Sequence, residues 1–108
     1  MANTFKNEQV QNVTTGWSDI GSAVTSQQRT IIGMTIANTE SSVIAVEVVI
    51  LNGSTRTYLV KDAPIPTGGA LIVVGGDQKV VLENGDKIQV KSNTATSADV
   101  VMSLLDIT

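Results

Sequence analysis

The 108-residue sequence contains no cysteine and no histidine. Without cysteine the chain forms no disulfide bonds and has no thiolate nucleophile, and without histidine it lacks imidazole acid–base catalysis and the usual zinc ligands. Aromatic side chains are also scarce, since Phe5, Trp17 and Tyr58 are the only ones. The stacking platforms on which sugars and nucleic-acid bases bind are therefore largely absent.

Basic residues are few as well: seven Lys and Arg stand against ten Asp and Glu, which gives a formal net charge of -3. They are spread along the chain and form no stripe for a phosphate backbone, so we expect no nucleic-acid partner. No apolar run approaches the roughly 20 residues of a membrane span, and the start, MANTFKNEQVQNV, has no apolar stretch behind a basic segment. We expect a chain that folds in the cytosol and has no membrane partner.

The residues that are abundant favour strands. Val and Ile make up 25 residues, Ser and Thr another 22, and Leu only six. β-Branched side chains are stiff at χ1 and pack well on a pleated sheet. The nine glycines and two prolines mostly lie between the apolar runs, where they mark turns. At this length we expect one set of strands around one core.

Residues 29–108 predict about seven core strands with a turn signal every ten residues or so. The expected strands are residues 29–38, 43–51, 55–61, 70–74, 79–83, 86–91 and 98–107. Asn52-Gly53 and Asn84-Gly85 are typical hairpin turns, and residues 62–69, with two prolines, predict a connection to another sheet. This pattern predicts an all-β fold, an antiparallel β-sandwich of jelly-roll or immunoglobulin-like type.

Alternation along these strands predicts which side chains form the core. In residues 86–91, Ile88 and Val90 point inward, while Lys87, Gln89 and Lys91 point outward. Ile32, Met34 and Ile36 are expected to share one face of the first strand, and Ala98, Val100, Met102 and Leu104 are expected to share one face of the last.

Residues 1–28 differ from the β-sandwich domain predicted for residues 29–108. They are rich in Asn, Gln, Thr and Ser and show no sustained hydrophobic period, so they predict an extended N-terminal arm. Short strands are expected around residues 9–14 and 16–20, and a polar terminus that frays is the alternative. Phe5 and Trp17 either cap the sandwich of their own subunit or anchor the arm on a neighbour, and the sequence leaves both open.

Four acidic residues near one another in sequence are the main candidates for chemistry: Asp62, Asp77, Glu83 and Asp86. Paired carboxylates can hydrolyse glycosides, and carboxylate oxygens can bind calcium. These four lie at turn positions, where acidic side chains bond to the local backbone, and no alternating ligand spacing is present. We therefore expect no enzyme activity, no catalytic residue, no cofactor and no metal site.

The expected strand at residues 43–51 is apolar on both faces, and Glu47 is its one charged residue. A carboxylate in such a run faces solvent or meets a cation. A solvated rim position is the favoured interpretation, and a buried pair with Arg29 or Arg56 of a neighbouring subunit is the alternative.

The composition favours association, because 42% of the residues are apolar and only 16% are charged. We predict a homo-oligomer. The residues predicted to form its interface, or the interface with a larger assembly, are Phe5, Trp17, Val43, Glu47, Val49 and Leu51.

Several longer strings carry a resemblance to a known family. The start MANTFKN, residues 33–39 (GMTIANT), residues 58–95 and the ending SADVVMSLLDIT resemble small virion structural proteins of tailed bacteriophages, notably those of marine bacteria and cyanobacteria. Residues 59–86, which include LVKDAPIP and LENGD, are the most specific part.

The resemblance implies a non-enzymatic component of the virion that is made in the host cytoplasm. Its implied partners are phage capsid or tail proteins, and no small-molecule substrate is expected. A capsid decoration or cement protein is the favoured role, and a neck, tail or fibre-attachment protein is the alternative. A weak glycan-binding adhesion module on the same particle is a third reading, which the scarce aromatics disfavour.

Overall fold

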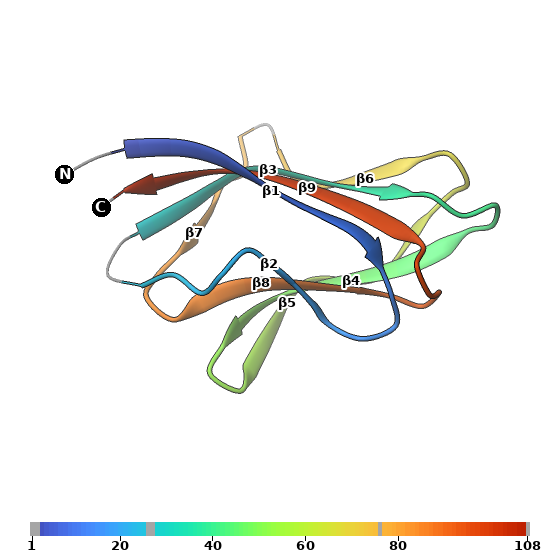
Figure 1. Cartoon of the computed structure of the whole chain (residues 1–108), viewed down its shortest axis with the longest axis horizontal. Coiled ribbons are helices and arrows are strands. Elements are labelled where there is room, and N and C mark those ends of the chain that lie inside the picture. The colour runs from blue at the N-terminus through green and yellow to red at the C-terminus, as the bar shows by residue number, and fades with distance from the viewer. Residues whose placement is uncertain (1–2, 26–27, 76, 108) are drawn as a thin grey trace.

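The computed structural model describes residues 3–25, 28–75 and 77–107, and this part of the chain forms nine strands in two antiparallel sheets (Figure 1). The prediction of an all-β antiparallel sandwich is confirmed. Across the described residues there is no helix that could cross a membrane. The strands are β1 (Asn3–Val13), β2 (Ser18–Ile20), β3 (Gln28–Asn38), β4 (Ile44–Asn52), β5 (Thr55–Ile65), β6 (Ala70–Val74), β7 (Val80–Leu82), β8 (Asp86–Ser92) and β9 (Ala98–Ile107).

One sheet has five strands in the order β1-β9-β3-β6, with β7 also paired to β3, and the other has four in the order β2-β8-β4-β5. They form the upper and lower layers of Figure 1. Because β5 and β6 belong to different sheets, the proline-containing connection does carry the chain across the sandwich, as predicted. Seven strands, β3 to β9, follow the N-terminal segment, which also agrees with the prediction.

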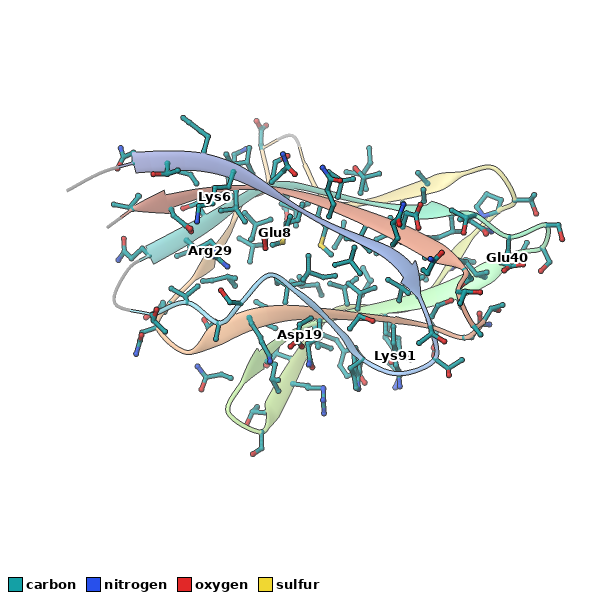
Figure 2. The ribbon with its side chains drawn as sticks, viewed as in Figure 1. Lys6, Glu8, Asp19, Arg29, Glu40 and Lys91 are labelled. Carbon is teal, nitrogen blue, oxygen red and sulfur yellow. The ribbon has the colours of Figure 1, made fainter. Side chains whose placement is uncertain are left out.

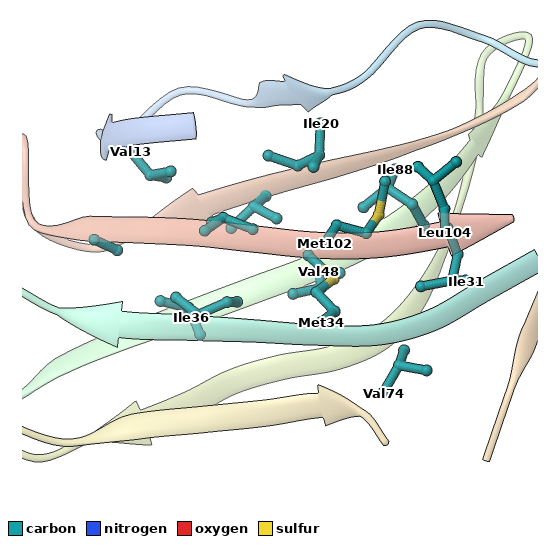
Figure 3. Packing of buried hydrophobic residues seen from close by; sticks show 14 of the residues in the cluster. Val13, Ile20, Ile31, Met34, Ile36, Val48, Val74, Ile88, Met102 and Leu104 are labelled. Carbon is teal, nitrogen blue, oxygen red and sulfur yellow. The ribbon is translucent and has the colours of Figure 1, made fainter. Parts of the chain in front are cut away.

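The core fills the space between the two sheets (Figure 3). Both predicted alternations in the C-terminal half are confirmed, in β8 and in β9. At about 25 cal/mol per Å² of buried apolar surface, each fully buried aliphatic side chain contributes roughly 1.5–3 kcal/mol. The buried apolar side chains of the core cluster are Val13, Ile20, Val24, Ile31, Met34, Ile36, Ile44, Val46, Val48, Ile65, Val74, Leu82, Ile88, Val90, Ala98, Val100, Met102 and Leu104.

The prediction that Ile32, Met34 and Ile36 share one face of β3 is wrong at Ile32. Ile31 is fully buried, whereas Ile32 is only half-buried. The register against β9 shifts between Ile31 and Gly33, which is a β-bulge. The bulge inserts one extra residue and resets the alternation, so Ile31 and Met34 both face the core although they are three residues apart.

The predicted end of β5 is also wrong, because the strand continues through Pro64 to Ile65. Ala45 of β4 lies opposite Pro64, and Ile44 lies opposite Ile65. β5 is an edge strand of its sheet, and an edge tolerates a proline where its N–H would face away from the neighbouring strand. Asp62 has a φ of 52°, and the register shifts beside it, so the strand bends before the proline.

The N-terminal segment supplies one strand to each sheet. β1 pairs with β9 from Asn3 to Val13, far beyond the short strand expected at residues 9–14, and β2 pairs with β8. At Asn12, which has a φ of 59°, the register shifts and Val13 turns into the core. Val13, Ile20 and Val24 are all fully buried. These three side chains pack the segment on its own subunit, whereas Phe5 stays 75% exposed, so docking of Phe5 on a neighbour remains a prediction.

A buried ion pair joins the ends of three strands of the larger sheet. Arg29 of β3 donates from Nε to Oδ1 of Asp106 in β9 at 2.7 Å, and from Nη2 to Oδ2 at 3.2 Å. Lys6 of β1 lies 3.2 Å from the same Oδ2. Arg29 Nη1 also donates to the carbonyl of Ser22, so the pair ties down the segment before β3. Figure 2 shows Lys6 and Arg29 on the side of this sheet that faces the other layer.

This environment lowers the pKa of Asp106. The main cause is the hydrogen bonding from Arg29, supported by Lys6, and it outweighs the opposing effect of burial. The carboxylate form therefore stabilises the fold.

Candidate functional site

The acidic residues considered for chemistry do not assemble into a site. Among the described residues, no three Asp or Glu side chains come together as a metal site, and no pocket is found. Asp86 is a turn residue: its carboxylate accepts hydrogen bonds from the Glu83 backbone N–H at 3.0 Å and from Asn52 Nδ2 at 2.6 Å. Asp62, Asp77 and Glu83 are exposed. The candidate sites are the outer faces of the two sheets.

The outer face of the five-stranded sheet carries large exposed apolar side chains, and we name it the apolar face. Phe5 is 75% exposed, Ile72 70%, Val81 57% and Val101 48%. They come from four strands, β1, β6, β7 and β9.

Strand register arranges these side chains in two rows across the sheet. One row consists of Phe5, Leu105, Thr30 and Val81, and the other of Gln9, Val101, Thr35 and Ile72. No residue of either row is charged. Covering such a surface removes apolar area from water without stripping water from an ion, so the apolar face suits a protein partner.

The outer face of the four-stranded sheet differs, because it gathers aromatic rings and cations; we name it the cationic face. Arg56 of β5 places its guanidinium carbon 4.9 Å from the centroid of the Trp17 ring. Lys91 of β8 places Nζ 4.7 Å from the same centroid. The Tyr58 ring lies 6.4 Å from Trp17 at a tilt of 59°, and Lys61 Nζ is 5.1 Å from the Tyr58 centroid. Cations held over aromatic rings gain about 0.5–1 kcal/mol each at exposed sites.

Hydrogen bonds fix the middle of the cationic face. Gln89 donates to Asp19 Oδ1 at 2.7 Å and accepts from Arg56 Nε at 3.1 Å. Lys87 Nζ donates to the other carboxylate oxygen of Asp19 at 3.0 Å. The hydrogen bond from Gln89 is the main cause of a lowered pKa of Asp19, and the bond from Lys87 lowers this pKa further. Gln89 was predicted to point outward. The Gln89 side chain does lie on the outer face of the sheet, but it is buried there, where it bonds to Asp19 and Arg56.

The predicted interface residues fall in different places. Phe5 lies on the apolar face, Trp17 is half-buried on the cationic face, and Val43 is 60% exposed just before β4. Leu51 is half-buried. Val49 has no exposed surface, so it offers nothing to a partner and is removed from the predicted interface.

Glu47 meets a cation from its own subunit. It lies directly across from Lys91 in the β4–β8 register, and Oε2 is 3.7 Å from Lys91 Nζ. The suggested partners were Arg29 and Arg56, but Arg29 pairs with Asp106 inside the sandwich and Arg56 bonds to Gln89. Both predicted environments of Glu47, a solvated rim position and an intersubunit ion pair, therefore differ from the observed one. Its carboxylate is partly covered and pairs with a lysine of the neighbouring strand.

The buried pair of Arg29 and Asp106 was not predicted from the sequence, although the alternation of β9 contained a signal for it. Asp106 continues the series Ala98, Val100, Met102 and Leu104, so the same period predicts an inward carboxylate. The surface that Ile72, Val81 and Val101 share was not predicted either. They lie on three separate strands, and their proximity depends on strand order.

Comparison with known proteins finds similarity in fold. Neither a protein-family model nor a curated protein sequence matches the chain. A chain of the acidic stable capsid structure of Helicobacter pylori bacteriophage KHP30 has a TM-score of 0.59 and 9% identity, covering 100% of this chain and 89% of that one. A chain of Bacillus endospore appendages, a family of disulfide-linked pili, has a TM-score of 0.55 and 15% identity, covering 100% of this chain and 91% of that one.

At these identities the likeness shows a shared fold. The two similar chains come from a phage capsid structure and from a pilus, and each is matched over most of its length. The sequence of this chain contains no cysteine with which to form such a disulfide link. The fold class is therefore a whole-chain antiparallel sandwich that is found in a capsid structure and in a surface appendage.

Proposed function

We propose that the protein is a non-enzymatic structural component of a bacteriophage virion, and that it acts as a decoration or cement protein on the capsid shell. The observation that carries the proposal is the apolar face, with Phe5 and Ile72 each at least 70% exposed on a sheet whose two cross-strand rows carry no charge. Exposed apolar surface of this kind marks a protein interaction site. The whole-chain likeness to part of a phage capsid structure and the sequence resemblance to small virion proteins support the same role.

In this role, the apolar face lies against the shell and the rest of the sandwich faces outward. Many copies, each bound weakly, would together hold adjoining shell subunits through multivalency. The partners are capsid proteins and other copies of this chain, and binding is through shape and apolar contact.

Copy number tests where in the virion the protein acts. Quantitative mass spectrometry of purified particles against the major capsid protein is expected to give hundreds of copies per particle. A dozen or fewer would contradict the cement role and support the neck, tail or fibre-attachment alternative. Absence from purified particles would overturn the virion role itself.

Two substitutions on the apolar face and one control outside it test this surface. Phe5→Ser and Ile72→Ser each remove an exposed apolar side chain from this face, and Val43→Ser removes one outside it. Because all three side chains are exposed, we expect each variant to keep its thermal stability. Particles assembled without the protein should bind Val43→Ser as they bind the unmodified chain, and the two apolar-face variants clearly less. Equal binding of all three variants would show that another surface docks.

A further inference from the structure

We propose that the cationic face is a second binding surface and that its ligand is a carboxylate-rich segment of a partner protein. It lies on the opposite layer of the sandwich from the apolar face. Four of the seven basic residues of the chain belong to it: Arg56, Lys61, Lys87 and Lys91.

The charge distribution of the chain points to an anionic ligand. Two of the ten acidic residues, Asp19 and Glu47, share the cationic face, whereas the chain as a whole carries a net charge of -3. Positive charge is thus concentrated on one side of a negatively charged protein. Such an asymmetry orients an approaching anionic partner and speeds its association.

The cations are held in place before any ligand arrives. Arg56 is fixed by the Trp17 ring and by the bond from its Nε to Gln89. Its Nη1 and Nη2 make no hydrogen bond with the described residues, and these are the nitrogens that a carboxylate can engage. Lys91 rests over Trp17 and meets Glu47 only at 3.7 Å. A side chain that is already ordered loses less conformational entropy on binding.

The same geometry argues against a neutral sugar or a nucleic acid. Stacking needs an open ring, but the Trp17 ring already has two cations over it and the Tyr58 ring has one. A phosphate backbone carries a charge at every nucleotide and would bring some of them close to Asp19 and Glu47. An extended peptide can place its carboxylates on alternate residues, where they can meet Arg56, Lys61 and Lys91. The neutral residues between them can lie next to Asp19 and Glu47 without repulsion.

The experiment uses Trp17 as the reporter, since it is the one tryptophan of the chain and lies at the centre of the face. The probe is a synthetic ten-residue peptide of alternating Glu and Thr, titrated into the full-length protein while Trp17 fluorescence is recorded. The comparison ligands are the same peptide with Gln for Glu, and a ten-nucleotide oligothymidylate. We expect a saturable change with the Glu peptide that weakens as salt is raised, and none with the Gln peptide.

Variants locate the binding. Arg56→Gln and Lys91→Gln are each expected to lower the affinity for the Glu peptide by about two- to fivefold, which is the range typical of one exposed charge pair. Lys79→Gln removes the same charge from the turn before β7 of the other sheet and should leave binding unchanged. Phe5→Ser should also leave it unchanged, so a failure here is separate from a failure of the capsid role.

Three outcomes would overturn the proposal. The first is no saturable response to the Glu peptide, and the second is equal binding of the Gln peptide, which would mean that charge is not recognised. The third is tighter binding of the oligothymidylate, which would assign the face to nucleic acid.

Discussion

The buried pair of Arg29 and Asp106 offers the most decisive test of how this fold is held together. Asp106→Ala would leave the guanidinium of Arg29, a residue that is 5% exposed, without the carboxylate that accepts two of its hydrogen bonds. Removing one member of a buried pair costs about 3–5 kcal/mol, because a charge stays buried without its partner. Lys6 adds little to this loss, since its side chain is half-exposed and can turn to solvent.

For a domain of this size, such a loss lowers Tm by about 12–20 °C, at roughly 4 °C per kcal/mol. The measurement is urea unfolding at pH 7 followed by Trp17 fluorescence, together with a thermal melt. The informative comparison is the double variant Arg29→Met, Asp106→Leu. Replacing a buried ion pair by apolar side chains of similar size is often neutral or stabilising. The Ser22 carbonyl loses one donor, at about 1 kcal/mol, so we expect the double variant within about 2 kcal/mol of the unmodified chain.

Two results would refute this reasoning. A loss below about 1 kcal/mol for Asp106→Ala would mean that the ion pair contributes no more than a surface pair. A double variant as unstable as Asp106→Ala alone would mean that the ion pair itself stabilises the fold, and that the unpaired Arg29 charge is not the cause of the loss.

Three further predictions follow from the fold. Lowering the pH should destabilise the protein, because the pKa of Asp106 in the folded state lies below its unfolded value near 3.9. The stabilisation from the Asp106 carboxylate is complete above the unfolded pKa and disappears as the pH falls through the folded-state pKa. Urea melts should therefore show that the free energy of unfolding falls less steeply with acid in the double variant than in the unmodified chain. Ile31→Ala should cost about 2–5 kcal/mol and Ile32→Ala clearly less, and equal costs in urea melts would contradict the bulge. Deleting residues 1–20 removes β1, β2 and two fully buried side chains, so we expect an unfolded chain by circular dichroism; a folded one would show that the arm is dispensable.

The strands themselves could be predicted because the chain follows period-2 alternation and uses specific turn residues. Ile88 and Val90 alternate with polar neighbours and are buried as expected. Gly53 follows Asn52 in the hairpin that joins β4 and β5, and it has the positive φ that such a turn requires. Gly85 follows Asn84 and also has a positive φ, but the hairpin predicted there is wrong, because β7 and β8 belong to different sheets. Both signals act over a few residues, so they need no knowledge of the rest of the fold.

The errors occur where a neighbouring strand decides. Ile31 replaces Ile32 in the core because β3 bulges against β9, and Pro64 remains within β5 because that strand lies at an edge. The N-terminal segment has no period of its own, yet it forms β1 because β9 provides a row of backbone partners for it. Pairing of this kind depends on strands far apart in the chain, and propensity does not contain that information.

The candidate surfaces show the same division. The sequence by itself determined the chemistry available: no histidine or cysteine, three aromatic rings, little charge and many β-branched residues. Strand order and register then decided which of these residues meet, placing Phe5 opposite Leu105 on one face, and Arg56 and Lys91 over the Trp17 ring on the other. The physical reason is that composition and alternation set what each strand can bury or expose, whereas a surface is made by neighbours that only the tertiary fold brings together.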